Sequence, residues 1–206
     1  LTSTIENSVT VTAAADEFDA KTVNGAGQLT LTGTGTGGTD LSNISADILD
    51  ITGANLSAGV TFASTISSGD EIKATAAQVT GKTIAGAGVL TISGTASDTN
   101  FSALTAAVVD VTAATLNGTS NFGSAIAEGD EFRFTAAQVT GKTIGGAGTK
   151  TITKLNADLD ADLSNISSGT ITAAFEDDGT FTGDLGSATV TVTDSKTMTA
   201  GYSVLN

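Results

Sequence analysis

The sequence predicts an all-β protein that folds as a parallel β-solenoid. The first observation is a long repeat, because the segment Thr75–Ile84 (TAAQVTGKTI) recurs at Thr135–Ile144 and a diverged third copy ends in Ala20–Gly27. The lysines of the three copies lie 61 and 60 residues apart, at Lys21, Lys82 and Lys142. The second observation is a subperiod, since short pieces of the form apolar–x–apolar–Thr return about every 20 residues. Self-similarity at a fixed period is typical of repeat architectures.

The ten short pieces are the predicted strands. Apolar and polar residues alternate in them with the two-residue period of a half-buried strand. We expect their second apolar positions to stack in one inward column: Val11, Leu31, Ile51, Ala74, Ile92, Val111, Phe134, Ile152, Ile171 and Val192. A small residue follows most of the pieces, which suits a sharp bend, and Gly- or Asn-rich turns come next. A second apolar set should continue the core around each coil: Val23, Ile44, Phe62, Ile84, Leu104, Phe122, Ile144, Ile166 and Phe181.

The length of the subperiod selects a solenoid coil. Twenty residues are fewer than the roughly 30 that a strand–helix–strand unit needs. We therefore expect about ten coils of roughly 20 residues, grouped in threes as 60-residue repeats, with almost no helix. The coils should be right-handed, because parallel crossovers almost always are and the hexapeptide rhythm of left-handed β-helices is missing. The alternative is an array of 60-residue β-sandwich modules, but such modules give no reason for a 20-residue subperiod.

The repeats divide the chain into units within a single predicted domain, residues 1–206. The repeat units are approximately 8–71, 72–131 and 132–194, and residues 195–206 form a terminal segment. Leu1 opens directly into repeat-like sequence, so we expect a processed chain or part of a longer protein. No apolar run approaches 18 residues, so membrane insertion is not expected.

Composition excludes several classes of function. The chain has 8 Lys and Arg against 22 Asp and Glu, a net charge of −14, which makes nucleic acid an unfavourable partner. It has no His and no Cys, which excludes Ser-His-Asp and Cys-His catalysis and any disulfide. A carbohydrate-active β-helix enzyme that uses carboxylates is the remaining enzymatic alternative. Such a site needs long loops, and the short coils favour a protein with no catalytic residues.

The outward strand positions predict a hydroxyl ladder with charges beside it. Thr or Ser follows the inward column at Thr12, Thr32, Thr52, Thr75, Ser93, Thr112, Thr135, Thr153, Thr172 and Thr193. Regular threonine arrays on flat solenoids bind ice, whereas the simpler interpretation is exposed strand threonines that hydrogen-bond to the next coil. Charges in the neighbouring column interrupt a flat plane and disfavour ice binding. We expect them to form ion pairs between adjacent coils, Asp50 with Lys73 and Asp110 with Arg133.

Acidic clusters are the only candidate metal ligands. Asp158, Asp160 and Asp162 lie on one side of the chain if this segment is extended, and Ca²⁺ prefers six to eight oxygen ligands. Calcium is thus the one metal that the sequence suggests, and no other cofactor is expected. The alternative is that these carboxylates are solvated corners of the coils without a ligand.

Two groups of motifs resemble a known class of protein. They are the TAAQVTGKTI segments at 75–84 and 135–144, and Asp40–Ser45 (DLSNIS), which returns at Asp162–Ser167. They are similar to the β-strand repeats of very large bacterial surface proteins of cyanobacterial and marine type, which are adhesin-like or S-layer-associated. Similar repeats occur in phage fibres. The resemblance covers most of residues 8–170 and implies an extracellular or cell-surface structural or adhesive role.

The expected function follows from the fold and the resemblance together. We expect a rigid rod or filament whose coils stack end to end with flanking repeats or with further subunits, because an uncovered solenoid end exposes unpaired backbone groups. The apolar segment Met198–Asn206 would be a poor solubilising cap. Surface polysaccharide is the other partner that the resemblance suggests. The alternative role is a virion appendage, such as a segment of a tail fibre or spike.

Overall fold

The computed structural model describes residues 2–56, 59–123, 126–156, 160–176, 178–192 and 198–200. Strands make up 56% of it and helices 7%, and the parallel sheet winds as a β-solenoid of about 8 turns. The predicted fold class is confirmed, with about 8 turns in place of the ten expected. The chain divides into two compact units: unit 1 holds residues 1–109 and 113–120, and unit 2 holds residues 110–112 and 121–206.

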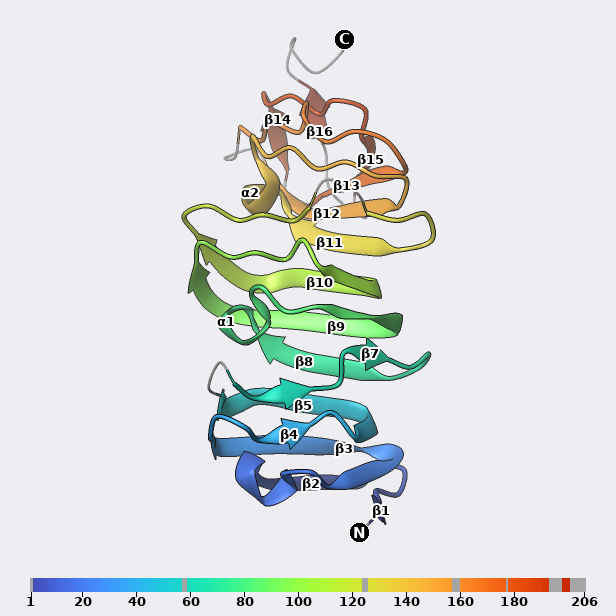
Figure 1. Ribbon diagram of the computed structural model, residues 1–206. Helices are drawn as coiled ribbons and strands as arrows, with labels where there is room; N and C mark the ends of the chain where they lie inside the picture. The colour runs from blue at the N-terminus through green and yellow to red at the C-terminus, as the bar shows by residue number, and fades with distance from the viewer. Residues whose placement is uncertain are drawn as a thin grey trace. The chain divides into compact units, whose positions relative to one another are not determined.

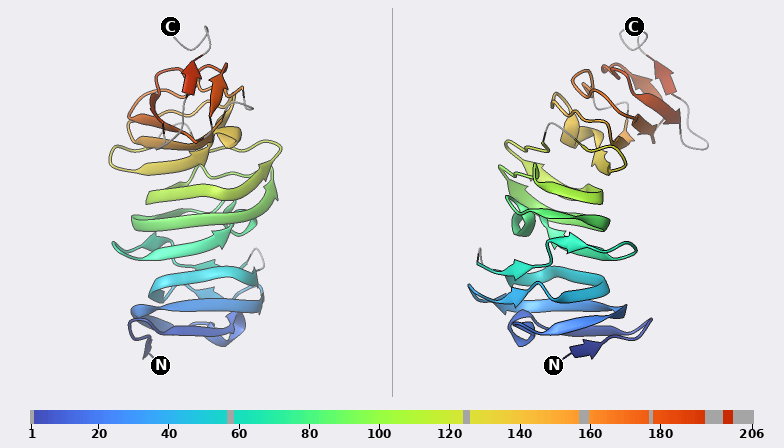
Figure 2. Two further views of the ribbon diagram at one scale, coloured as in Figure 1. Left: turned by 180° about the vertical axis from the view of Figure 1, so that it is seen from behind. Right: turned by 45° about the vertical axis from the view of Figure 1, so that its right-hand side comes forward.

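Unit 1 is a ladder of parallel strands lying side by side (Figures 1 and 2). Strand β3 pairs with β5, β5 with β8, and β8 with β9, while two short strands, β1 and β2, both pair with β3. A second, two-stranded sheet joins β4 and β6. The elements are β1 (Thr2–Thr4), β2 (Thr10–Ala14), η1 (Ala15–Phe18), β3 (Thr22–Gly35), β4 (Asp40–Leu41), β5 (Ile44–Leu56), β6 (Thr61–Phe62), β7 (Thr65–Ile66), β8 (Glu71–Thr75), α1 (Ala76–Val79), β9 (Ile84–Ser97) and β10 (Leu104–Asn117), of which residues 110–112 belong to unit 2.

Inward-facing residues of successive strands form the core of unit 1. Leu29, Leu49, Ile72 and Leu90 are register partners from β3 to β9 and are at most 4% exposed. Burying each such side chain contributes about 1.5–3 kcal/mol, and a coil can bury it only against its neighbours. The predicted second apolar set is buried as well, at Val23, Ile44, Phe62, Ile84, Leu104, Phe122, Ile144 and Ile166. The side chain of Phe181 lies outside the described residues.

Unit 2 repeats this arrangement with shorter strands. Strand β11 pairs with β12, β12 with β13, and β13 with β15, all in parallel, and β14 pairs with β16 in a second sheet. The elements are β11 (Glu131–Thr135), α2 (Ala136–Val139), β12 (Thr149–Leu155), β13 (Ile171–Phe175), β14 (Gly179–Phe181), β15 (Thr189–Val192) and β16 (Met198–Ala200). Each of the ten predicted pieces corresponds to a strand of the two units, from β2 to β15.

The predicted inward column is correct in part. Ala74 and Ile92 are register partners as expected, and so are Phe134 and Ile152. Three other members are displaced along their strands, and the observed partners are Leu29 for Val11, Lys150 for Ile171, and Phe175 for Val192. Each displacement is an even number of residues. An even shift keeps the same face inward, so the apolar pattern determines which face is buried but not the register.

The Gly-Ala-Gly motif of the repeat is required by a close approach between coils. An added Cβ at Gly86 would lie 2.2 Å from the carbonyl oxygen of Ile66, and one at Gly88 would lie 2.4 Å from the Ile66 side chain and from the carbonyl oxygen of Ser67. Ile66 is 3% exposed, is the last residue of β7 and is the register partner of Gly86. Strand β9 therefore lies directly against the end of β7 and the turn that follows it, while pairing with both β7 and β8. Only a residue without a side chain fits at these two positions.

The TAAQV segments form one-turn helices that join the coils. In α1, the Thr75 hydroxyl accepts a hydrogen bond from the Gln78 N–H (3.3 Å), and the Gln78 Oε1 accepts one from the Thr75 N–H (2.7 Å), which is a capping box. The Gln78 Nε2 donates to the carbonyls of Ile51 and Ala54 on the preceding coil, each at 2.8 Å. In α2, Gln138 makes the matching bonds to the Thr135 N–H and the Val111 carbonyl. The glutamine thus fastens each helical corner to the coil before it.

Substituting Gln78→Ala is expected to lower the free energy of unfolding by about 1–3 kcal/mol, because the carbonyls of Ile51 and Ala54 lose their donor. Gln28→Ala is the matched control, since the Gln28 amide donates only to the Thr30 hydroxyl of its own strand, and a change within about 0.5 kcal/mol is expected. Urea unfolding followed by circular dichroism measures both. Equal losses for the two variants would contradict the fastening role of Gln78.

Candidate functional site

The outward face of the main sheet carries the hydroxyl and charged columns that the sequence predicts. Their register partners are Thr30, Asp50, Lys73 and Thr91 in unit 1, and Arg133, Thr151, Thr172 and Thr189 in unit 2. Several hydroxyls bond to the preceding coil, as Thr32 donates to the Ala13 carbonyl and Thr153 to the Phe134 carbonyl, both at 3.2 Å. These hydroxyls therefore hold coils together, which matches the simpler of the two interpretations of the ladder.

A charged cluster stands on this face at two places, around Lys73 and, 60 residues later, around Arg133. In unit 2, the Arg133 guanidinium lies 2.9 Å from the Glu131 carboxylate and 3.9 Å from the Asp110 carboxylate. Glu131 also accepts a hydrogen bond from the Thr151 hydroxyl of the next coil (2.7 Å). The hydrogen bond from Arg133 holds the pKa of Glu131 below its ordinary value. The predicted Asp110–Arg133 pair is present, as one contact of a larger cluster.

The copy of this cluster in unit 1 corrects the predicted Asp50–Lys73 pair. Lys73 lies beside Asp50 in the ladder, but its ion pair is with Glu71 of its own strand, at 3.6 Å. The Asp50 carboxylate instead accepts hydrogen bonds from the N–H and hydroxyl of Thr52 (3.0 and 2.6 Å). Lys73 thus contacts one carboxylate, whereas the Arg133 guanidinium, a planar group with five N–H donors, contacts two.

The predicted calcium ligands are only partly within the described residues. Asp162 accepts hydrogen bonds from the Ser164 N–H (3.0 Å) and hydroxyl (2.6 Å), which lower the pKa of its carboxyl. Asp160 accepts one from the Thr182 hydroxyl. Asp158 lies outside the described residues, and among those described no three acidic side chains gather in a group that would hold a metal ion. Asp160 and Asp162 thus each take part in a turn or coil contact.

The calcium prediction is tested by thermal unfolding. If Asp158, Asp160 and Asp162 bind Ca²⁺ in the folded state alone, the ion raises Tm by mass action, with a stabilisation of about 2.7 kcal/mol at a hundred times Kd. Melting curves in millimolar Ca²⁺ and in chelator provide the comparison, and Asp158→Asn should remove any difference. Identical curves would leave only the solvated-corner interpretation.

Lys150 is the residue that the sequence interpretation missed. It occupies an inward position of β12, opposite Phe132 and Ile171, and is 0% exposed. Its ammonium donates to two carbonyl oxygens on its own coil, that of Gly146 and that of Gly148, the latter at 3.2 Å. It also donates to two on the next coil, those of Ser167 (3.4 Å) and Ser168 (2.7 Å). Burial lowers the pKa of this amine. The unusual signal in the sequence is a lysine where the preceding repeat has Leu90.

The shorter strand β12 of unit 2 explains why a lysine occupies this inward position. In unit 1, strand β9 continues for 14 residues through the Gly-Ala-Gly motif, whereas β12 begins only at Thr149 and has 7 residues. The carbonyls of Gly146 and Gly148 thus lie outside the strand. Buried carbonyls need a donor, and the Lys150 ammonium supplies it.

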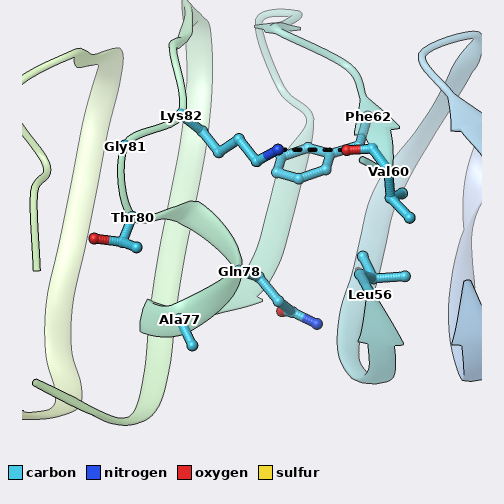
Figure 3. Close-up of a pocket in the computed structure, with 8 residues that line it drawn as sticks. All are labelled: Leu56, Val60, Phe62, Ala77, Gln78, Thr80, Gly81 and Lys82. Atoms are coloured by element: carbon cyan, nitrogen blue, oxygen red, sulfur yellow. Dashed lines mark hydrogen bonds between the residues drawn. The ribbon is translucent and has the colours of Figure 1, made fainter. Parts of the chain in front are cut away.

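One pocket adjoins the α1 corner of unit 1 (Figure 3). Its cavity is about 370 Å³, and its lining residues are Leu56, Val60, Phe62, Ala77, Gln78, Thr80, Gly81 and Lys82. The Lys82 ammonium donates to the Val60 carbonyl at 3.4 Å, as Figure 3 shows. The Gln78 amide is engaged by the three bonds described above. Among these lining residues there is no carboxylate, so the pocket holds no pair of acidic groups for general acid–base chemistry.

The fold and these sites together define the class: a repetitive parallel β-solenoid whose polar side chains mainly join its coils. No protein family, curated protein or solved structure was found to match the chain. Across the described ranges, no helix has the length and apolar character needed to cross a membrane.

Proposed function

We propose that this chain is a structural or adhesive repeat protein of the cell surface or extracellular space, where its coils form part of a rigid rod or filament. The supporting observation is the parallel ladder, in which each coil buries its apolar side only against the next. The polar groups of Lys150, Gln78 and Arg133 are engaged in bonds within or between coils. Such an arrangement suits mechanical continuity better than turnover of a substrate.

End-to-end stacking is the assembly that this function needs. Within the described residues, β2 pairs only with β3. The Val9 carbonyl accepts a hydrogen bond from the Gln28 N–H of β3 (2.9 Å). Backbone groups of successive strand residues point in opposite directions, so the N–H and C=O groups of Thr10 and Thr12 point away from β3, toward the open edge of β2. An edge of this kind is a template for another strand. A further coil, from a flanking repeat or a second copy, is the partner that matches it.

The assembly is tested by measuring mass against concentration for residues 1–206. We expect oligomers that lengthen along one axis in electron micrographs, and Thr12→Pro should shorten them because proline removes the N–H of the open edge. Thr12→Val keeps this N–H and is the matched control. A constant monomer mass at all concentrations would contradict end-to-end stacking.

The site of action is tested by labelling intact cells of the source organism with an antibody against unit 1. Decoration of the cell surface or of extracellular filaments is expected. Decoration confined to virus particles would assign the chain to a virion appendage instead. Reproducible depolymerisation of a polysaccharide, lost on carboxylate substitution, would make it an enzyme.

A further inference from the structure

Two parallel registers of β12 and β13 satisfy the apolar pattern. In the observed register, Lys150 faces Ile171 and Ile152 faces Ala173. In a register displaced by two residues, Ile152 would face Ile171 and join two large apolar side chains. The same faces of both strands remain inward after this shift. The apolar pattern alone even favours the displaced register, because that is the pairing predicted from sequence spacing.

The acceptors of Lys150 distinguish the two registers. In the observed one, its ammonium reaches two carbonyls on its own coil and those of Ser167 and Ser168 on the next coil. A two-residue shift would move β13 by roughly 6.6 Å along the strand. Ser167 and Ser168 lie shortly before β13 in the chain, so their carbonyls would be drawn away from the ammonium. The ammonium, which is 0% exposed in the observed register, would then keep about half of its acceptors. A buried charge that lacks partners is strongly unfavourable.

We propose that Lys150 specifies the register between β12 and β13, and thereby one fold of unit 2. Fixing a register is the best-attested use of a buried polar residue. The repeats give this chain a particular need for it, because similar strands offer alternative partners. In the preceding repeat the same position holds Leu90, whose register partner is Ile72, and the strand there is continuous through the glycines.

Engineered disulfides can report the register, because the chain contains no cysteine. The pair Thr151→Cys with Thr172→Cys reports the observed register, in which these residues are partners. The pair Thr151→Cys with Thr170→Cys reports the displaced one. Partners on adjacent strands lie about 4.8 Å apart, within the range that a disulfide spans. Each cysteine pair is refolded from urea in a glutathione buffer, once in a protein that keeps Lys150 and once in a protein that carries Lys150→Met. This substitution roughly preserves the volume of the side chain.

With Lys150 present, the effective concentration of the Thr151–Thr172 pair should exceed that of the Thr151–Thr170 pair by at least about tenfold. With Lys150→Met, this preference should fall to about threefold or less, because the displaced register no longer leaves a buried charge without hydrogen-bond acceptors. Lys150→Arg should keep the preference, since it keeps the charge and the donors. A unit 1 pair, Lys73→Cys with Thr91→Cys, reports an unrelated register and should not respond.

Two results would overturn the proposal. One is an unchanged preference for the observed register with Lys150→Met. The other is the loss of both unit 2 disulfides to the level found in denaturant, because Lys150 would then be needed for folding itself and not for the choice between registers. Neither result depends on whether the chain assembles into rods.

Discussion

Substituting Gly88→Ala is expected to lower the free energy of unfolding of unit 1 by about 2–3 kcal/mol. The new methyl group would lie 2.4 Å from the Ile66 side chain, 2.4 Å from the carbonyl oxygen of Ser67 and 2.6 Å from that of Asp70. Two of these three atoms belong to the backbone, so the turn between β7 and β8 must move as a whole. That movement weakens the pairing of β9 with both strands.

Two neighbouring glycines separate crowding from backbone strain. Gly69 has a φ of +94°, but an added Cβ there meets nothing within 4 Å, so Gly69→Ala should cost about 1–2 kcal/mol from conformation alone. Gly86 combines a φ of +114° with a contact of 2.2 Å, and Gly86→Ala should be the most damaging, at about 3–5 kcal/mol.

Urea unfolding followed by circular dichroism gives the ranking, and hydrogen exchange of the amides of β9 assigns the loss to unit 1. The expected order of damage is Gly86→Ala, then Gly88→Ala, then Gly69→Ala. If Gly88→Ala proved as mild as Gly69→Ala, close packing of β9 against Ile66 and the turn after β7 would not be the reason for the Gly-Ala-Gly motif.

The fold could be predicted because repetition and alternation are properties of the sequence itself. The repeat of Thr75–Ile84 at Thr135–Ile144 sets the long period, and the apolar pieces mark the strands, which the structure places as expected. The offset between strands was harder to predict. The apolar pattern has a period of two, so it determines the inward face but leaves shifts of two or four residues open. Val11, Ile171 and Val192 are displaced by such shifts.

The sequence contains a signal for the helical corners that the pattern of strand pieces does not include. Thr75 followed by Gln78 has the Ser/Thr–x–x–Glu/Gln spacing of a capping box, which indicates a helix start even for a single turn. The contacts of the Gln78 amide with the Ile51 and Ala54 carbonyls were not predictable, because they join residues 27 and 24 positions apart.

The candidate site was less predictable than the fold because it depends on side-chain length and on broken strands. Asp50 and Asp110 occupy matching positions, yet only Asp110 pairs with the basic residue of the next coil. The difference between Lys73 and Arg133 decides this. Lys150 falls within one of the predicted strand pieces, and the neighbouring sequence gives no indication of the carbonyls of the next coil to which it donates.

Substituting Lys150→Ala is expected to lower the free energy of unfolding of unit 2 by about 3–5 kcal/mol, more than Lys150→Met. Alanine leaves the carbonyls of Gly146, Gly148, Ser167 and Ser168 without this donor and also opens a cavity in the core. Lys154→Ala is the matched control, because Lys154 lies on the same strand but is exposed. It removes the same charge and should change the free energy by no more than about 0.5 kcal/mol.

The pH dependence provides a second measurement on the Lys150→Ala variant. Burial lowers the pKa of Lys150 in the folded state, while in the unfolded state it titrates near about 10.4. Between these two values the unfolded state binds more protons, so the contribution of Lys150 to stability rises with pH. The stability difference between the unsubstituted protein and Lys150→Ala should therefore widen as pH rises through this window. A difference that does not change with pH would show that the Lys150 amine is not held in a dry core.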